Sequence, residues 1–112
     1  MDGKVLLKQR PPEGLLGGLW EFPNWKIEER KDIRLRLRLR NCIKKGTGMD
    51  GEVKESIGTF QQTYSHFKLT LHVYHCQAIS RDQNGNWVSV KKLSLLPMSR
   101  IHRKIAETIL PK

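Results

Sequence analysis

The chain has 112 residues, enough for one domain with a single hydrophobic core. It carries 21 lysines and arginines against 11 aspartates and glutamates, and the resulting net charge of +10 favours polyanions such as nucleic acid or an anionic membrane surface. No apolar run approaches the roughly twenty residues of a membrane-spanning helix, and the first residues lack the apolar stretch of a signal peptide. We therefore expect an intracellular domain without a membrane partner, cytoplasmic if the source is bacterial.

The first predicted strand is the short apolar run at 5–7, directly after Asp2-Gly3, a dipeptide that favours a tight hairpin turn. The strand on the other side of that turn is absent from the sequence. This favours a fragment of a longer chain that continues upstream of Met1, and a native start with a flexible end is the alternative. A loop rich in proline and glycine at 11–18 then leads into a short strand at 19–22.

The segment 33–40 alternates apolar residues strictly with arginines, which taken locally is typical of a strand with an arginine face. In a helix these arginines would form like-charge pairs four residues apart, at a cost of about a few tenths of a kcal/mol each. However, Asp32 is a good helix cap, leucine and arginine have high helix propensity, and Gly46 stands where a helix would end. We predict a helix, because tertiary context commonly overrides short patterns.

Two further strands are predicted at 57–64 and 67–79. In the second, apolar and polar residues alternate with a period of two, which indicates a half-buried strand. Asn84-Gly85 then turns the chain into a strand at 87–90, and the pattern predicts a hairpin.

The last segment, 99–110, is predicted to be helical, with Ser99 as its cap and Pro111 as its stop. Its apolar stripe is formed by residues four apart, namely Ile101, Ile105 and Ile109. Its other face carries three cations that either form a solvated surface or contact phosphates: Arg100, Arg103 and Lys104.

The two cysteines, Cys42 and Cys76, lack CxxC spacing, which indicates reduced, buried thiols rather than a disulfide or a metal site. His72 and His75 lie close to Cys76 in sequence, but on a strand His75 points away from the other two. A zinc site would need a fourth ligand and better convergence. We expect no metal and no cofactor in this domain.

The run Tyr64-Ser65-His66 leads into the predicted strand at 67–79 and combines three kinds of chemistry suited to inspecting a nucleobase. A tyrosine ring can wedge between or stack on bases. A serine hydroxyl both donates and accepts a hydrogen bond. A histidine can reach a phosphate or orient the loop. Taken alone, such a triplet is also compatible with an ordinary turn that has a packed ring.

Three segments of this chain occur together in a known family: QRPPEGLLGGLWEFP at 9–23, TYSHF at 63–67 and LPMSRIHRKI at 96–105. In this respect the chain, over essentially all of its 112 residues, resembles the C-terminal domain of adenine DNA glycosylases of the MutY type. The resemblance implies a single α+β domain with the MutT-like Nudix fold, a mixed sheet sandwiched between helices. That fold also has its long helix at the alternating arginine segment.

The resemblance further implies a role in base excision repair, with double-stranded DNA containing an 8-oxoguanine:adenine mispair as partner. Tyr64, Ser65 and His66 would then contact the lesion, although Tyr64 departs from the phenylalanine common in the family. The catalytic aspartate and the iron-sulfur cluster of such enzymes belong to an upstream domain of the same chain, and no segment here matches them. We expect a monomeric domain that binds DNA while the upstream domain removes the adenine.

Two alternatives stay open: a stand-alone Nudix-fold nucleotide hydrolase, and a basic nucleic-acid-binding module without lesion specificity. Active Nudix enzymes hold Mg²⁺ with glutamates clustered on one helix. An ungapped alignment from the Trp-Glu-Phe-Pro segment puts Lys31 at the first of these glutamates and the sequence LRNCIK, at 39–44, at their core. Because every carboxylate is missing in this register, we expect no hydrolase activity; Glu28 and Glu29 lie too early unless a gap shifts the register.

Overall fold

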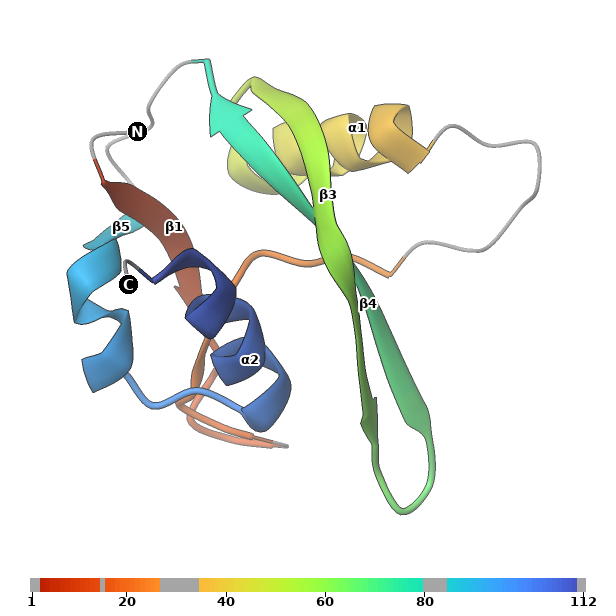
Figure 1. The fold of residues 1–112 in the computed structure, drawn as a ribbon, viewed down its shortest axis with the longest axis vertical. Helices are drawn as coiled ribbons and strands as arrows, with labels where there is room; N and C mark the ends of the chain where they lie inside the picture. The colour runs from red at the N-terminus through yellow and green to blue at the C-terminus, as the bar shows by residue number, and fades with distance from the viewer. Residues whose placement is uncertain (1–2, 15, 27–34, 80–84, 111–112) are drawn as a thin grey trace.

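The computed structural model describes residues 3–14, 16–26, 35–79 and 85–110. Within these ranges the chain forms five strands, two α-helices and one 3-10 helix (Figure 1), which confirms the α+β class. In chain order the elements are β1 (Lys4–Gln9), β2 (Trp20–Glu21), α1 (Leu35–Thr47), β3 (Gly51–Thr63), β4 (Lys68–Ala78), β5 (Asn86–Ser89), η1 (Val90–Leu95) and α2 (Arg100–Ile109).

The first sheet has the strand order β2-β1-β5, and β1 pairs antiparallel with both neighbours. The predicted hairpin between the strand at 67–79 and the strand at 87–90 is wrong, because β5 pairs with β1 instead of β4. In the pairing of β5 with β1, Val88 lies opposite Val5 and Trp87 lies opposite Leu6, so the two strands approach closely. Gly85 permits this approach, since a Cβ there would lie 2.6 Å from Leu6 Cδ1. Asn84 lies outside the described residues.

The hydrophobic core lies between this sheet, η1 and α2. Leu7, Leu93 and Ala106 form its buried centre, and half-buried side chains from β1, β2, β5 and α2 pack around them. The predicted apolar stripe of the last helix is confirmed: Ile101 and Ile105 are buried, and Ile109 packs against the core. The predicted Ser99 cap is only half right, since Ser99 precedes the helix but its side chain makes no capping hydrogen bond.

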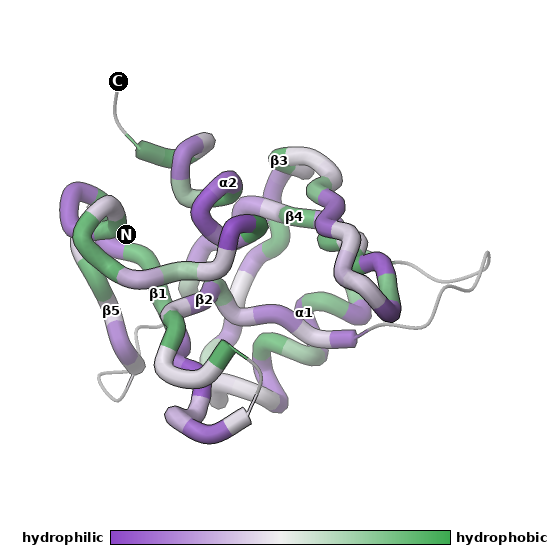
Figure 2. The backbone as a smooth tube through the Cα atoms, turned by 90° about the horizontal axis from the view of Figure 1, so that it is seen from below, coloured by the Kyte–Doolittle hydropathy of each residue, from purple (hydrophilic) through white to green (hydrophobic). Residues whose placement is uncertain are grey.

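The described part of the arginine-rich segment is helical, so the helix prediction is confirmed for α1, whereas Asp32 and residues 33–34 lie outside the described residues. Leucine and arginine alternate over residues 35–40 of this helix (Figure 2), and none of its residues is fully buried. The helix ends later than expected: Gly46 is inside it, and Gly48, at φ +77°, follows its last residue. The Gly48 N–H donates to Lys44 O at 2.9 Å, as in a helix C-terminal cap.

The hairpin β3–β4 forms a separate two-stranded ribbon. Its first strand starts at Gly51, six residues before the predicted start. The prediction missed this part because the residues after Gly51 are mostly polar and do not show the pattern typical of a strand. Near the loop, the predicted alternation holds and the half-buried face includes Phe60 and Leu71, which are register partners. Beyond Val73 the half-buried face changes sides, since Tyr74, Cys76 and Ala78 are now the less exposed residues. Register shifts in β3 accompany this change.

Candidate nucleic-acid interface

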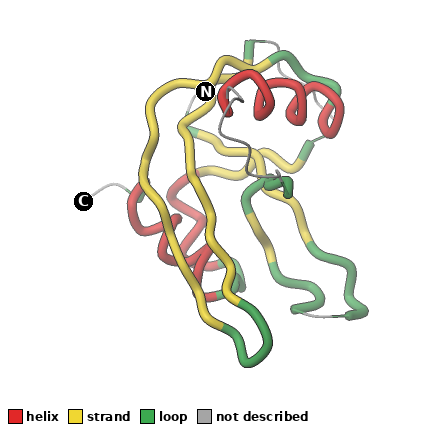
Figure 3. Tube along the Cα trace, turned by 90° about the vertical axis from the view of Figure 1, so that its right-hand side faces the viewer, coloured by secondary structure: helices red, strands yellow, loops and turns green. Residues whose placement is uncertain are grey.

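The loop that joins β3 to β4 lies at the end of the ribbon that is remote from α1 (Figures 1 and 3). It consists of residues 64–67, closed by a hydrogen bond from Tyr64 N–H to Phe67 O at 2.7 Å. Thr63 and Lys68 form the last register pair before the loop. This hydrogen bond and the paired strands anchor the backbone of the loop, so the predicted triplet lies at the tip of a well-defined ribbon.

Tyr64 and Phe67 face each other across the loop. Their ring centroids lie 4.7 Å apart with an interplanar angle of 26°, a stacked arrangement. Phe67 is half exposed, at 50%, and Tyr64 is partly buried. Such an aromatic pair is worth about 0.5–1.5 kcal/mol beyond the burial of its area. We infer that Phe67, which the sequence prediction did not include in the site, holds the tyrosine ring in place.

Ser65 and His66 lie at the turn itself, and both are exposed. Among the described residues, none donates to or accepts from the Ser65 hydroxyl or the His66 ring. The hydroxyl can therefore donate and accept toward an incoming group. The structure thus brings the three predicted residues together in one loop.

The three cations predicted on the last helix have different surroundings. Arg100 and Lys104 are exposed. Arg103 is partly buried, and its guanidinium donates to Leu93 O at 2.8 Å and to Leu96 O. Arg103 thus ties α2 to η1, so Arg100 and Lys104 are the better candidates for phosphate contacts.

The Trp-Glu-Phe-Pro segment is held by the last helix through His102, which sequence analysis left unassigned. The Phe22 N–H donates to His102 Nδ1 at 3.2 Å, and the two rings stack at 5.9 Å. His102 is buried, and this burial lowers the pKa of its imidazole, although the Glu21 carboxylate 3.9 Å from Nε2 partly opposes the effect. The same segment is also linked to the residues before α2, by a hydrogen bond from Trp20 N–H to Pro97 O.

Helix α1 carries no carboxylate: its sequence is LRLRLRNCIKKGT. A helix of this composition supplies no carboxylate ligand for Mg²⁺, and its arginines and lysines would repel the ion. Within the described residues, no three histidine, cysteine or acidic side chains are grouped to hold a metal. Glu28 and Glu29 lie outside the described residues.

The two cysteines and the neighbouring histidines take part in local contacts. Cys42 and Cys76 are free thiols and half-buried, less buried than predicted. Burial raises the pKa of the Cys76 thiol, and the positive charge of Arg36 acts in the opposite direction. On the exposed ribbon, His75 Nδ1 lies 3.1 Å from Glu55 Oε1, and His72 Nδ1 lies 3.4 Å from Thr59 Oγ1.

Residues 1–108 match the family described as NUDIX domain, and the chain belongs to this family. Its fold is the Nudix fold: over 96% of this chain and 80% of the other, it superposes on the solution structure of the E. coli ORF135 protein with a TM-score of 0.70 and 27% sequence identity. No helix in the described ranges is both long enough and apolar enough to cross a membrane.

Two kinds of curated relatives are similar in sequence. The human adenine DNA glycosylase is 34% identical over 74 residues, which is 66% of this chain and 14% of that enzyme. The mouse adenine DNA glycosylase is 36% identical over 106 residues, 90% of this chain and 21% of that enzyme. The CTP pyrophosphohydrolase of Escherichia coli is 35% identical over 74 residues, 66% of this chain and 53% of that protein. The chain thus spans a small part of the glycosylases and about half of the pyrophosphohydrolase.

Proposed function

We propose that this domain binds duplex DNA and reads 8-oxoguanine opposite adenine, as a lesion-recognition module of an adenine DNA glycosylase. The observation that carries the proposal is the loop at the tip of the β3–β4 ribbon, where Ser65 has an exposed hydroxyl without a partner among the described residues, beside a stacked aromatic pair. The similarity to adenine DNA glycosylases supports it. Removal of the adenine would belong to an upstream domain.

The chemistry of the lesion explains why a hydroxyl suits this task. Guanine presents N7 as an acceptor, whereas 8-oxoguanine presents an N7–H donor and an additional carbonyl oxygen. The Ser65 hydroxyl can accept from the first and donate to the second. With guanine the hydroxyl could still donate to N7, but it would have neither the N7–H donor nor the additional carbonyl oxygen, so one of the two hydrogen bonds would be lost, at about 1–3 kcal/mol. Tyr64 would stack on or wedge beside a base, and Arg100 and Lys104 would contribute affinity that does not depend on sequence.

A hydrolase function is the second candidate, favoured by the similarity to CTP pyrophosphohydrolase. The composition of α1 argues against it, because the helix offers cations where a diphosphate-bound Mg²⁺ needs carboxylates. A Mg²⁺-dependent assay with nucleoside triphosphates tests this directly. We expect no turnover, and hydrolysis that disappears with a substitution in this chain would favour the hydrolase.

The test of the lesion-reading function is a binding comparison on matched duplexes with 8-oxoguanine or guanine opposite adenine. We expect wild-type protein to prefer the 8-oxoguanine duplex, and Ser65→Ala to reduce that preference by about 1–3 kcal/mol. Ser94→Ala, an exposed serine on η1, is the matched control and should change nothing. Equal binding of both duplexes by the wild type would indicate a basic module without lesion specificity.

The double variant Tyr64→Ala, Ser65→Ala extends this test. A backbone N–H could compensate for the lost hydroxyl, so the double variant also removes the ring that would position the base. If both variants left discrimination unchanged while circular dichroism showed an intact fold, the loop would not be the reader.

A further inference from the structure

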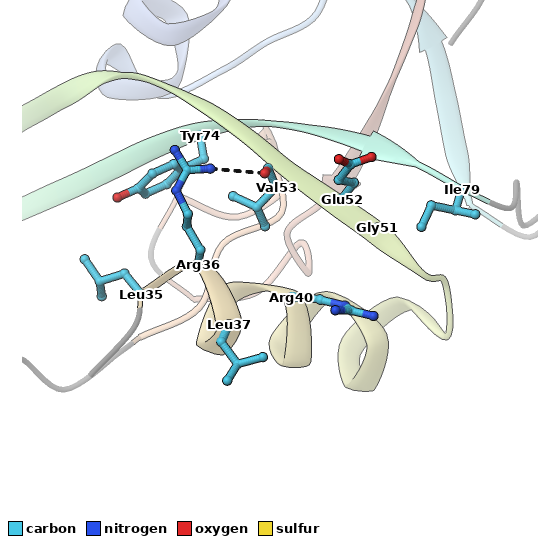
Figure 4. A pocket seen from close by; sticks show the side chains of 9 residues that line it. All are labelled: Leu35, Arg36, Leu37, Arg40, Gly51, Glu52, Val53, Tyr74 and Ile79. Atoms are coloured by element: carbon cyan, nitrogen blue, oxygen red, sulfur yellow. Dashed lines mark hydrogen bonds between the residues drawn. The ribbon is translucent and has the colours of Figure 1, made fainter. Parts of the chain in front are cut away.

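A groove of about 870 Å³ lies between α1 and the base of the β3–β4 ribbon (Figure 4). Helix α1 lies at the end of the ribbon away from the hairpin loop (Figure 1). Helix α1 forms one wall with Leu35, Leu37 and Arg40, and the end of β4 contributes Tyr74 and the adjoining Ile79. The proposed DNA contacts lie on the hairpin loop and on α2, so the groove is a separate surface.

The groove collects exposed aliphatic side chains. Among the described residues five large apolar side chains are well exposed, and three of them line this groove. Their exposed fractions are 40% for Leu35, 50% for Leu37 and 65% for Ile79. Single exposed apolar residues are ordinary, but three along the rim of one groove, two on α1 and one just after β4, mark a candidate binding surface (Figure 4).

Some charged side chains in the groove have hydrogen-bond or ion-pair partners, and one does not. Arg36 donates to Val53 O at 3.1 Å and to Lys54 O, and its guanidinium lies 5.5 Å from the centre of the Tyr74 ring. Arg40, by contrast, has no hydrogen-bond or ion-pair partner among the described residues. The carboxylate that lines the groove, Glu52, is paired with Lys54 at 3.1 Å. The groove therefore offers an unpaired cation and no unpaired carboxylate.

We propose that this groove binds an acidic amphipathic helix of a partner protein. Its aliphatic side chains would cover Leu37 and Ile79, and a carboxylate on its rim would pair with Arg40. The charge is complementary, because α1 carries no acidic residue and the whole chain has a net charge of +10. A DNA backbone would use Arg40 but would leave the aliphatic side chains in water, which is why a protein segment fits better.

The probe is a fluorescent peptide of about 16 residues with leucines at helical i, i+3, i+4 and i+7 spacing and glutamates elsewhere. Binding is measured by anisotropy. One control peptide replaces the glutamates by lysines, and a second replaces the leucines by serines. Arg40→Glu and Ile79→Ser remove the cation and one aliphatic contact of the groove. Lys91→Glu and Leu95→Ser are matched controls, since both residues are exposed outside the groove.

We expect the acidic leucine peptide to bind wild-type protein, and each groove variant to lose about tenfold or more in affinity while the control variants do not. Both control peptides should bind weakly. No binding of the acidic leucine peptide, equal binding by the serine control, or unchanged affinity in both groove variants would overturn the proposal. Loss of duplex DNA binding in Arg40→Glu without loss of peptide binding would also overturn it and assign the groove to DNA. Vesicles rich in phosphatidylglycerol that bind through the groove while the peptide does not would assign it to lipid.

Discussion

The indole of Trp25 packs directly on the backbone of Gly46, inside the last turns of α1. A Cβ built at Gly46 would lie 2.9 Å from both Cζ2 and Nε1 of the indole, closer than real contacts allow. Glycine inside a helix ordinarily costs about 1 kcal/mol relative to alanine. Here the missing side chain makes room for a ring that joins the loop after β2 to α1.

We predict that Gly46→Ala destabilises the domain although it raises helix propensity. The expected decrease in the free energy of unfolding is about 1–3 kcal/mol, the range for overpacking, measured by urea denaturation. In a Trp25→Ala background the same substitution should instead stabilise the protein, because the clash is gone and the propensity gain remains. A stabilising Gly46→Ala in the wild-type background would show that the indole moves aside freely.

A second prediction concerns Phe67. Phe67→Ala should free the Tyr64 ring and weaken binding to the 8-oxoguanine duplex by about 0.5–1.5 kcal/mol, the strength of an aromatic pair. Phe67→Tyr keeps a ring and should restore most of the affinity, as measured by titration of labelled duplex. If Phe67→Ala bound the duplex as tightly as the wild type, the stack would have no role in recognition.

Arg103 and its exposed neighbours should separate stability from DNA affinity. Arg103→Met removes the guanidinium donor from Leu96 O and from Leu93 O, which keeps only the Leu96 N–H at 3.3 Å, and we expect a loss of about 1–3 kcal/mol in unfolding free energy. Arg100→Gln and Lys104→Gln should each change stability by less than about 0.5 kcal/mol.

Arg100 and Lys104 should also contribute to DNA affinity, and this contribution should be the same with or without the lesion. Each substitution should weaken the 8-oxoguanine and guanine duplexes alike and reduce the salt slope of binding by about one unit. Lys91→Gln, on the exposed surface of η1, is the control. A salt slope that stays at the wild-type value in both variants would place the phosphate contacts elsewhere.

The buried His102 should make stability depend on pH. Its pKa is lowered in the folded protein, chiefly by burial, so the unfolded chain binds a proton more readily as the pH falls. The domain is therefore fully stable, with respect to this group, above the pKa of a free histidine. Its stability decreases as the pH falls through that value toward the lower pKa of the folded protein. Protonation of Nδ1 would also remove the acceptor of the Phe22 N–H.

The measurement compares urea unfolding at pH 7.5 and at pH 5.5 for the wild type and for His102→Gln. The variant should show the smaller loss of stability on acidification, because the other titrating groups are shared by both proteins. His72→Gln, at an exposed position on β4, should behave like the wild type. An equal loss in wild type and His102→Gln would mean that the imidazole does not carry the effect.

The elements that could be predicted from sequence are those whose pattern is set by one buried face. The isoleucine stripe of α2 and the alternation through Leu69 and Leu71 belong to this kind. The change of face beyond Val73 could not be predicted, because it accompanies register shifts in the partner strand, and the sequence of β4 does not record them. The choice of β1 over β4 as partner of β5 likewise depends on contacts between residues far apart in sequence.

The candidate loop was predicted from residue types together with the family resemblance. The structure places Tyr64, Ser65 and His66 at the tip of the ribbon, and their role in binding stays a prediction. The support from Phe67 was missed, since in the sequence it reads as the first apolar position of a strand. His102 was not assigned, and Arg103 was predicted only as a possible phosphate contact. On a helical pattern both count as polar positions, and the backbone groups that they bind lie in other segments.

The length of the β3–β4 ribbon determines the distance between the loop at its tip and the rest of the domain. Each residue pair advances the loop by about 3.4 Å and reverses the side on which successive side chains point. Adding two residues to both strands would carry the loop roughly 7 Å outward with its facing preserved. Adding one to each would turn the Ser65 side of the loop toward the opposite face. Where no further register shift intervenes, the depth of this contact therefore changes in steps of two residue pairs, and related domains with the same register shifts should differ in ribbon length by even numbers of pairs.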